Sequence, residues 1–74
     1  MPQQQADLFD RAAECEMASH NAMNAQQRLA LRRVRELWAD LANRSPGMTD
    51  AQVSEEIAAI EKRQATELGG NRVR

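Results

Sequence analysis

The longest run of strong helix formers, residues 24–43, constrains the fold more than any other feature. It reads NAQQRLALRRVRELWADLAN and contains neither glycine nor proline. Its large apolar side chains recur at the i, i+3, i+7 and i+10 spacing of one helix face: Leu31, Val34, Trp38 and Leu41. Because Ala30, Leu37 and Ala42 widen this face, it is typical of a helix packed into a core. We therefore predict that residues 24–43 form the central helix.

A first helix is predicted over residues 3–20, where Pro2 suits a position at the start of a helix. Small and apolar residues would line one face at i, i+4, i+7, i+11 and i+15: Leu8, Ala12, Cys15, Ser19 and Met23. Phe9 lies beside this face. Acidic residues would form a ridge on the opposite side: Asp7, Asp10 and Glu14. The core-facing side of this helix is narrow, so a neighbouring helix could approach it closely.

The junction between the first two helices has two interpretations. Asn21 suits the position after a helix end, and Asn24 suits the N-cap of the next helix. These residues favour a tight turn. No glycine or proline forces a break here, so one continuous helix through residue 43 is the alternative.

A third helix is predicted over residues 50–68, after a turn at Pro46 and Gly47. Thr49 can serve as its N-cap and Gln52 stands at the third helical position, which together form a capping box. An apolar seam would follow one side of the helix: Val53, Ile57, Ile60, Gln64 and Leu68. The strength of the capping signal makes the start of this helix the most sharply defined in the chain.

The three segments predict an all-α fold, a small three-helix hairpin or bundle in which residues 1–74 form one domain. Gly69 and Gly70 are expected to stop the third helix, and the tail 71–74 is expected to fray. A chain of this length buries only about 60% of its unfolded surface. A single cysteine provides no internal disulfide. We therefore expect homodimerisation to complete the fold.

The apolar faces of the central and third helices predict the core and the dimer interface. The residues assigned to them are Leu31, Val34, Trp38, Leu41, Val53, Ile57 and Ile60. Leu29 points away from this arc and would be exposed in a lone hairpin. A two-fold arrangement of two chains would cover these apolar surfaces at once.

Composition limits the classes of function. The formal net charge of −1 argues against a strongly basic nucleic-acid binder. No run approaches the ~18 apolar residues that suggest a membrane span, and the sequence starts without a basic, apolar leader. One cysteine fits a reducing compartment, so a cytoplasmic location is expected. One histidine, one cysteine and no tyrosine give no catalytic constellation, so we expect neither enzymatic activity, a small-molecule substrate nor a cofactor.

Cys15, Glu16 and His20 are the candidates for metal binding. Thiolate, carboxylate and imidazole would suit zinc, and Glu16 and His20 stand one helical turn apart. The chain has no second cysteine or histidine to complete a tetrahedral set. We therefore expect no metal site, but a small buried thiol and a histidine on the solvent side.

Charge separates by helix, with a basic central helix between two acidic ones. Arg28, Arg32 and Arg35 share one ridge that could follow a phosphate backbone. Acidic neighbours and the lack of interleaved aromatic residues favour salt bridges between helices instead. The predicted function is therefore a non-enzymatic protein–protein interaction or assembly module with an unidentified partner. A nucleic-acid-associated regulator that uses these arginines is the alternative.

One pattern extends over both halves of the predicted hairpin. Residues 11–15 read RAAEC, Arg28 follows after the turn, and Trp38 is then followed by Leu41 and Ala42. This resembles short uncharacterised helical-hairpin proteins of alpha-proteobacteria, in which an RAxEC-like helix precedes a helix that ends W-x-x-L-A. The match covers roughly residues 10–42. The resemblance implies a helical hairpin and assigns no activity and no functional residue.

Overall fold

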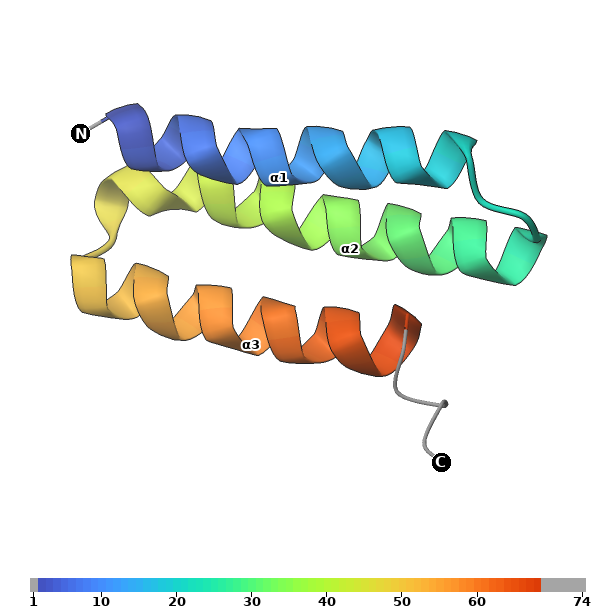
Figure 1. Cartoon of the computed structure of the whole chain (residues 1–74). Helices are drawn as coiled ribbons and strands as arrows, with labels where there is room; N and C mark the ends of the chain where they lie inside the picture. The colour runs from blue at the N-terminus through green and yellow to red at the C-terminus, as the bar shows by residue number, and fades with distance from the viewer. Residues whose placement is uncertain (1, 69–74) are drawn as a thin grey trace.

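The computed structural model describes residues 2–68 and contains three α-helices (Figure 1). They are α1 (Pro2–His20), α2 (Ala25–Arg44) and α3 (Asp50–Leu68), with a short 3-10 turn, η1 (Ser45–Gly47), before α3. No strand occurs in this part of the chain, so the all-α prediction is confirmed. The predicted helix bounds agree to within one residue. The expected stop at Gly69 and Gly70 and the tail 71–74 lie outside the described residues.

The chain breaks between α1 and α2, so the interpretation as one continuous helix is wrong. The backbone N–H of Asn21 donates to the carbonyl of Ala18 at 3.1 Å, and its side-chain amide donates to the carbonyl of Met17 at 3.2 Å. Asn24 is extended, and its Oδ1 accepts from the N–H of Gln27 at 2.7 Å. These bonds satisfy backbone groups that a helix end leaves without partners. The two asparagines therefore end one helix and start the next, as predicted.

Side-chain caps also define the second break. The hydroxyl of Ser45 donates to the carbonyl of Ala42, and Pro46 follows in η1. Thr49 and Gln52 then bond reciprocally. The Thr49 N–H donates to Oε1 of Gln52 at 3.0 Å, and the Gln52 N–H donates to Oγ1 of Thr49 at 3.1 Å. The predicted capping box is therefore formed at the start of α3.

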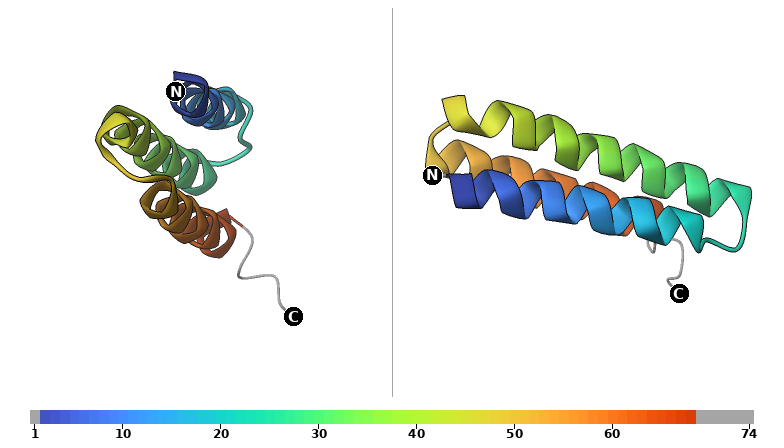
Figure 2. Two further views of the ribbon diagram at one scale, coloured as in Figure 1. Left: turned by 90° about the vertical axis from the view of Figure 1, so that its left-hand side faces the viewer. Right: turned by 90° about the horizontal axis from the view of Figure 1, so that it is seen from above.

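The three helices form an open bundle with α2 between the other two. Neighbouring helices run in opposite directions, and α2 packs against both α1 and α3 (Figure 1). Viewed end-on, α2 lies at the corner, while α1 and α3 are farther from each other than from α2 (Figure 2). The Cα atoms span 37 × 26 × 13 Å. The molecule is therefore thin in one direction, with a side between α1 and α3 that no helix covers.

The core lies where the three helices converge on α2. It consists of Leu8, Ala12, Cys15, Val34, Trp38, Leu41, Ala42, Val53 and Ile60. Trp38 is 1% exposed, and Val34, Leu41 and Val53 are fully buried. Of the residues predicted for the core and the dimer interface, Leu31 is also buried, whereas Ile57 is partly buried. One chain therefore buries the Trp38 face with its own helices, and a second chain is not required to cover it.

The core face of α1 differs from the prediction at one position. Leu8, Ala12, Cys15 and Ser19 are buried as expected, but Met23 is 90% exposed. The helix ends at His20, so the i+15 spacing no longer places Met23 on this face. Leu29 is 50% exposed, as predicted for a side chain that points away from the neighbouring helices.

Candidate functional site

Trp38 connects all three helices. Its indole N–H donates to Oε1 of Gln64 in α3 at 3.3 Å. From α1, the guanidinium carbon of Arg11 lies 4.8 Å from the ring centroid, within the range of a cation–π interaction. The Nη1 of Arg11 also lies 3.1 Å from Oε2 of Glu61. Arg11 therefore bridges α1 and α3 above the indole ring.

A shallow hollow lies beside this bridge, between α1 and α3. Its lining residues are Arg11, Glu14, Cys15, Ala18, Leu31, Trp38 and Gln64. Four of them are part of the sequence pattern that carries the resemblance described above: Arg11, Glu14, Cys15 and Trp38. The floor is apolar and the rim is charged, so the hollow can receive an apolar side chain but offers no paired catalytic groups.

Cys15 is the one nucleophilic side chain in this hollow. Burial, and secondly the negative charge of Glu14, raise the pKa of its thiol above the ordinary value. The thiolate is the reactive form of cysteine, so a raised pKa leaves the side chain protonated at neutral pH. Cys15 is therefore a packing residue in the core, as the sequence predicts.

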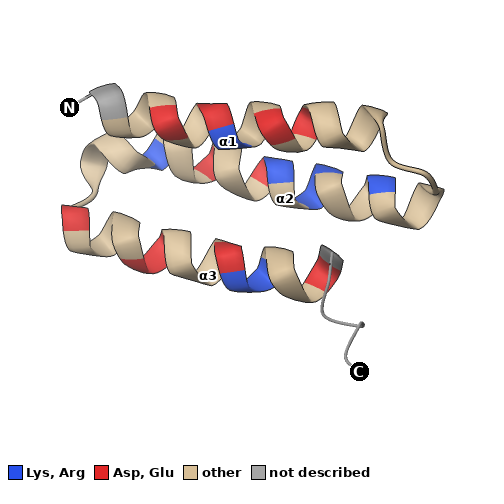
Figure 3. Ribbon diagram, viewed as in Figure 1, with Lys and Arg blue, Asp and Glu red and all other residues tan. Residues whose placement is uncertain are grey.

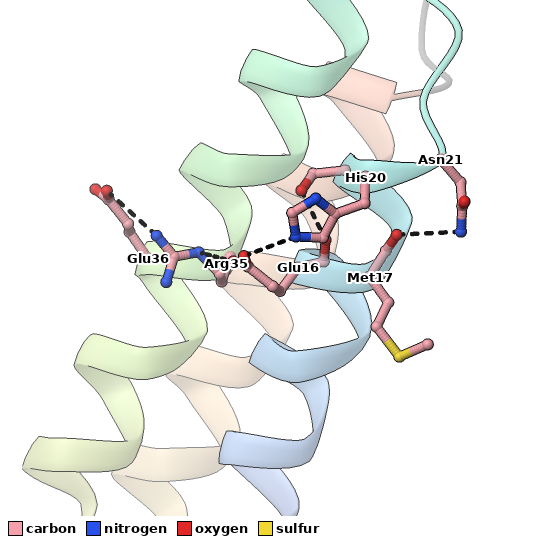
Figure 4. A network of polar contacts seen from close by, with 7 residues as sticks. Glu16, Met17, His20, Asn21, Arg35 and Glu36 are labelled. Atoms are coloured by element: carbon pink, nitrogen blue, oxygen red, sulfur yellow. Dashed lines mark hydrogen bonds and ion pairs between the residues drawn. The ribbon is translucent and has the colours of Figure 1, made fainter.

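Glu16 organises a polar network on the surface of α1 and α2 (Figure 4). Its Oε2 lies 3.1 Å from Nε2 of His20, one turn along α1. Its Oε1 lies 3.0 Å from Nε of Arg35 on α2. The Nε–H of Arg35 is not aligned with that oxygen, so charge rather than a hydrogen bond holds this pair. A second carboxylate, from Glu36, lies 3.9 Å from Nη2 of Arg35.

The three candidate metal ligands do not converge. Cys15 is buried in the core, whereas the side chain of His20 is 72% exposed and hydrogen-bonds to Glu16. Within residues 2–68 no group of three or more His, Cys, Asp or Glu side chains is placed to hold a metal ion. His20 therefore lies on the solvent side at the end of α1, where the sequence predicts it.

Four of the five arginines of α2 divide into two groups. Arg35 is held by Glu16, and Arg44 lies 2.8 Å from Asp40 and 3.8 Å from Glu56 on α3. The predicted salt bridges between helices therefore occur. Two arginines of the predicted phosphate-contacting ridge are different: Arg28 and Arg32 are exposed and form no ion pair with any described residue. We call these two residues the basic ridge.

Charge is also separated along the hairpin. The segment from Met17 to Arg35 contains no aspartate or glutamate, so its ionisable side chains are arginines and His20. In Figure 3 the part of α2 next to the α1–α2 turn is marked by arginines alone. The acids of α1 all precede this segment. Its acidic ridge, Asp7, Asp10 and Glu14, is exposed and forms no ion pair within the part of the chain that the structure describes. The order of the charged residues along the sequence shows this separation, whereas the net charge of each helix does not.

A second apolar surface lies on α1, away from the core. Its exposed residues follow the i, i+3, i+7 and i+11 spacing: Ala6, Phe9, Ala13 and Met17. Phe9 is 41% exposed and Met17 is 66% exposed. We call this set the outer α1 stripe. Met17 is therefore not a core residue, because α1 turns this side chain outward.

The outer α1 stripe lies between the acidic ridge and Glu16. Asp10 stands four residues after Ala6 and three before Ala13, so the acidic ridge borders one edge of the stripe. Glu16 stands three residues after Ala13 and faces α2 through Arg35. Arg32 and Arg28 continue the line of Arg35 at i−3 and i−7 toward the α1–α2 turn, so the basic ridge lies near the Met17 end of the stripe.

These features define the class of protein as a small open three-helix bundle with a polarised, partly apolar outer surface. No family model, curated protein or solved structure matches the chain. Among the helices of residues 2–68, none is both long enough and apolar enough to pass through a membrane.

Proposed function

We propose that the protein is a non-enzymatic protein–protein interaction or assembly module that works as a homodimer in the cytoplasm. The observation that carries this proposal is the outer α1 stripe. Its two large side chains, Phe9 and Met17, remain exposed although the core beneath them is closed. A continuous apolar stripe bordered by charges is typical of a surface that another macromolecule covers.

The surroundings of the reactive side chains support a non-enzymatic function. Cys15 is buried with a raised thiol pKa, and His20 is hydrogen-bonded to Glu16 on the surface. A nucleophile and a general base need to lie within hydrogen-bond reach to act together. The single cysteine supports a reducing compartment. The meeting of Arg11, Cys15 and Trp38 at one hollow supports kinship with the alpha-proteobacterial helical-hairpin proteins.

Light scattering and unfolding at several concentrations test the homodimer. At tens of micromolar we expect a mass of twice the 8.3 kDa of one chain. The melting temperature should rise with protein concentration, because association stabilises the folded state by mass action. A mass of one chain with a concentration-independent melt would contradict the homodimer.

A nucleic-acid-associated regulator is the second candidate. The observation that favours it is the basic ridge, because Arg28 and Arg32 are exposed within an acid-free segment. The test is fluorescence anisotropy with a generic DNA duplex at low salt. Binding that weakens steeply with salt and disappears in Arg28→Glu/Arg32→Glu would support it. The absence of binding at low salt would remove this candidate.

A further inference from the structure

We propose that the end of the hairpin at the α1–α2 turn binds the surface of an anionic lipid bilayer. The residues that make the contact are Met23, Arg28, Leu29, Arg32 and Arg33, and we call them the tip surface. Its arginines bind headgroup phosphates, and its apolar side chains enter the layer beneath them. This inference goes beyond the interaction module proposed above and does not depend on the homodimer.

The first argument is the position of two apolar side chains. The start of α2 projects beyond the ends of α1 and α3 (Figures 1 and 2). Residues 24–29 are all exposed, and the first buried residue of α2 is Ala30. Met23 is 90% exposed and Leu29 is 50% exposed. Both apolar side chains therefore face solvent at a projecting end of the molecule.

The second argument is the set of arginines around Leu29. Arg32 and Arg33 stand three and four residues after it, which is one helical turn away, and Arg28 stands one turn before Arg32. All three arginines are exposed, and none of them forms an ion pair with a residue of the described part of the chain. Apolar side chains next to arginines are typical of a helix that lies on a membrane surface.

The acids that border the tip surface are paired with other arginines. Oε2 of Glu36 lies 3.9 Å from Nη2 of Arg35. Glu67 of α3 lines the same hollow as Arg33, and its Oε2 lies 3.6 Å from Nε of Arg63. The three arginines of the tip surface therefore give this end of the hairpin an excess of positive charge, although the formal net charge of the chain is −1. Such an excess is attracted to the negative surface of a membrane that contains anionic lipids.

The apolar side chains distinguish a bilayer from other anionic partners. A phosphate backbone could pair with the arginines, but it offers no apolar layer to Met23 and Leu29. The tip surface also contains no aromatic residue on which a base could stack. A bilayer offers an anionic layer and an apolar layer together. No helix of residues 2–68 can cross a membrane, so the contact is limited to the bilayer surface.

Co-sedimentation of the full chain with sucrose-loaded vesicles tests the proposal. Vesicles of phosphatidylcholine with about one-third phosphatidylserine are compared with vesicles of phosphatidylcholine alone. The salt concentration is about 0.1 M, at which charges more than about 10 Å from the bilayer are largely screened. We expect binding to the anionic vesicles, little binding to the neutral vesicles, and weaker binding as salt is added.

The arginines are tested by a matched pair of variants. Arg28→Gln/Arg32→Gln should lower the partition coefficient for anionic vesicles at least about tenfold, because it removes two charges next to the headgroups. Arg44→Gln/Lys62→Gln removes the same amount of charge at exposed positions outside the tip surface. This control should bind as wild type does. Far-UV circular dichroism checks that each variant is folded.

The apolar side chains have a test of their own. Met23→Ser/Leu29→Ser keeps every charge of the chain and replaces two exposed side chains outside the core. It should lower the partition coefficient at least about tenfold, because less apolar surface leaves water on binding. A surface that acts by charge alone would bind this variant as it binds wild type.

Three results would overturn the proposal. The first is no binding of wild type to the anionic vesicles, and binding to a DNA duplex in its place would favour the nucleic-acid-associated regulator. The second is undiminished binding of Met23→Ser/Leu29→Ser, because charge alone then accounts for the contact. The third is an equal effect of Arg28→Gln/Arg32→Gln and its control, because the contact then lies outside the tip surface.

Discussion

The guanidinium carbon of Arg11 lies 4.8 Å from the centroid of the Trp38 ring, and this contact closes the one side of the core that no helix covers. The aliphatic part of an arginine can cover apolar surface while its charged group stays in water. Here that group also reaches Glu61 at 3.1 Å. Arg11 thus covers the indole ring on the side where no helix packs.

Replacing Arg11 and replacing Trp38 should lower the free energy of unfolding by different amounts. Arg11→Ala should lower the free energy of unfolding by about 1 kcal/mol, because its ion pair is solvent-exposed and its cation–π contact is partly so. Trp38→Ala should cost about 3–5 kcal/mol, since it leaves a large cavity among three helices. Urea unfolding measures both. Arg33→Ala, at an exposed position of α2, is the control and should change little, and an equal loss in this variant would contradict the assignment.

The capping box formed by Thr49 and Gln52 should stabilise the folded protein by stabilising the first turn of α3. Thr49→Ala should cost about 1 kcal/mol, because it removes the acceptor for the Gln52 N–H. For a domain of this size that corresponds to a fall in melting temperature of about 4–8 °C. Ser54→Ala, at an exposed position inside the same helix, is the matched control and should not destabilise. Thermal unfolding followed by circular dichroism is the measurement.

The η1 turn offers a stabilising substitution. Gly47 does not have a positive φ, and a Cβ atom built there meets nothing within 4 Å. Gly47→Ala should therefore stabilise the protein by about 0.4–1 kcal/mol, since alanine restricts the unfolded chain more than glycine does. A lower midpoint of urea unfolding in this variant would show that the turn needs glycine for another reason.

Stability should fall in alkaline solution because of Cys15. Burial and Glu14 raise the pKa of its thiol in the folded state, so between the unfolded and folded pKa values the folded protein holds more protons. Unfolding is then favoured as pH rises through this window, and the contribution of the thiol is fully present only below its unfolded pKa. Urea unfolding at several pH values should show this slope in wild type. Cys15→Ala should lack this slope.

Local signals in the sequence were sufficient to predict where the helices begin and end. The asparagines of the first turn and the Thr49–Gln52 box act over three or four residues, and each forms the hydrogen bond that its spacing predicts. Periodicity fails only where the backbone leaves the helix. Met23 matches the α1 core spacing, but α1 ends at His20 and the register ends with it.

Contacts between helices were not predictable in the same way. The sequence indicates that Trp38 belongs to an apolar face, but it does not indicate that Arg11 and Gln64 cover the ring from two other helices. The Trp38 face was for that reason assigned to an interface between chains. The sequence does not single out the outer α1 stripe, because helical spacing predicts one core-facing side, whereas α1 carries apolar residues on two sides.

The position of α2 between its neighbours also bears on how the chain folds. Each helix packs mainly against the one that follows or precedes it in sequence, so most contacts between helices join residues of one helical hairpin. Helical bundles, in which local contacts predominate, typically fold in microseconds to milliseconds. The Arg11–Glu61 bridge joins residues 50 positions apart, and it is the kind of contact that forms after the two hairpins have closed.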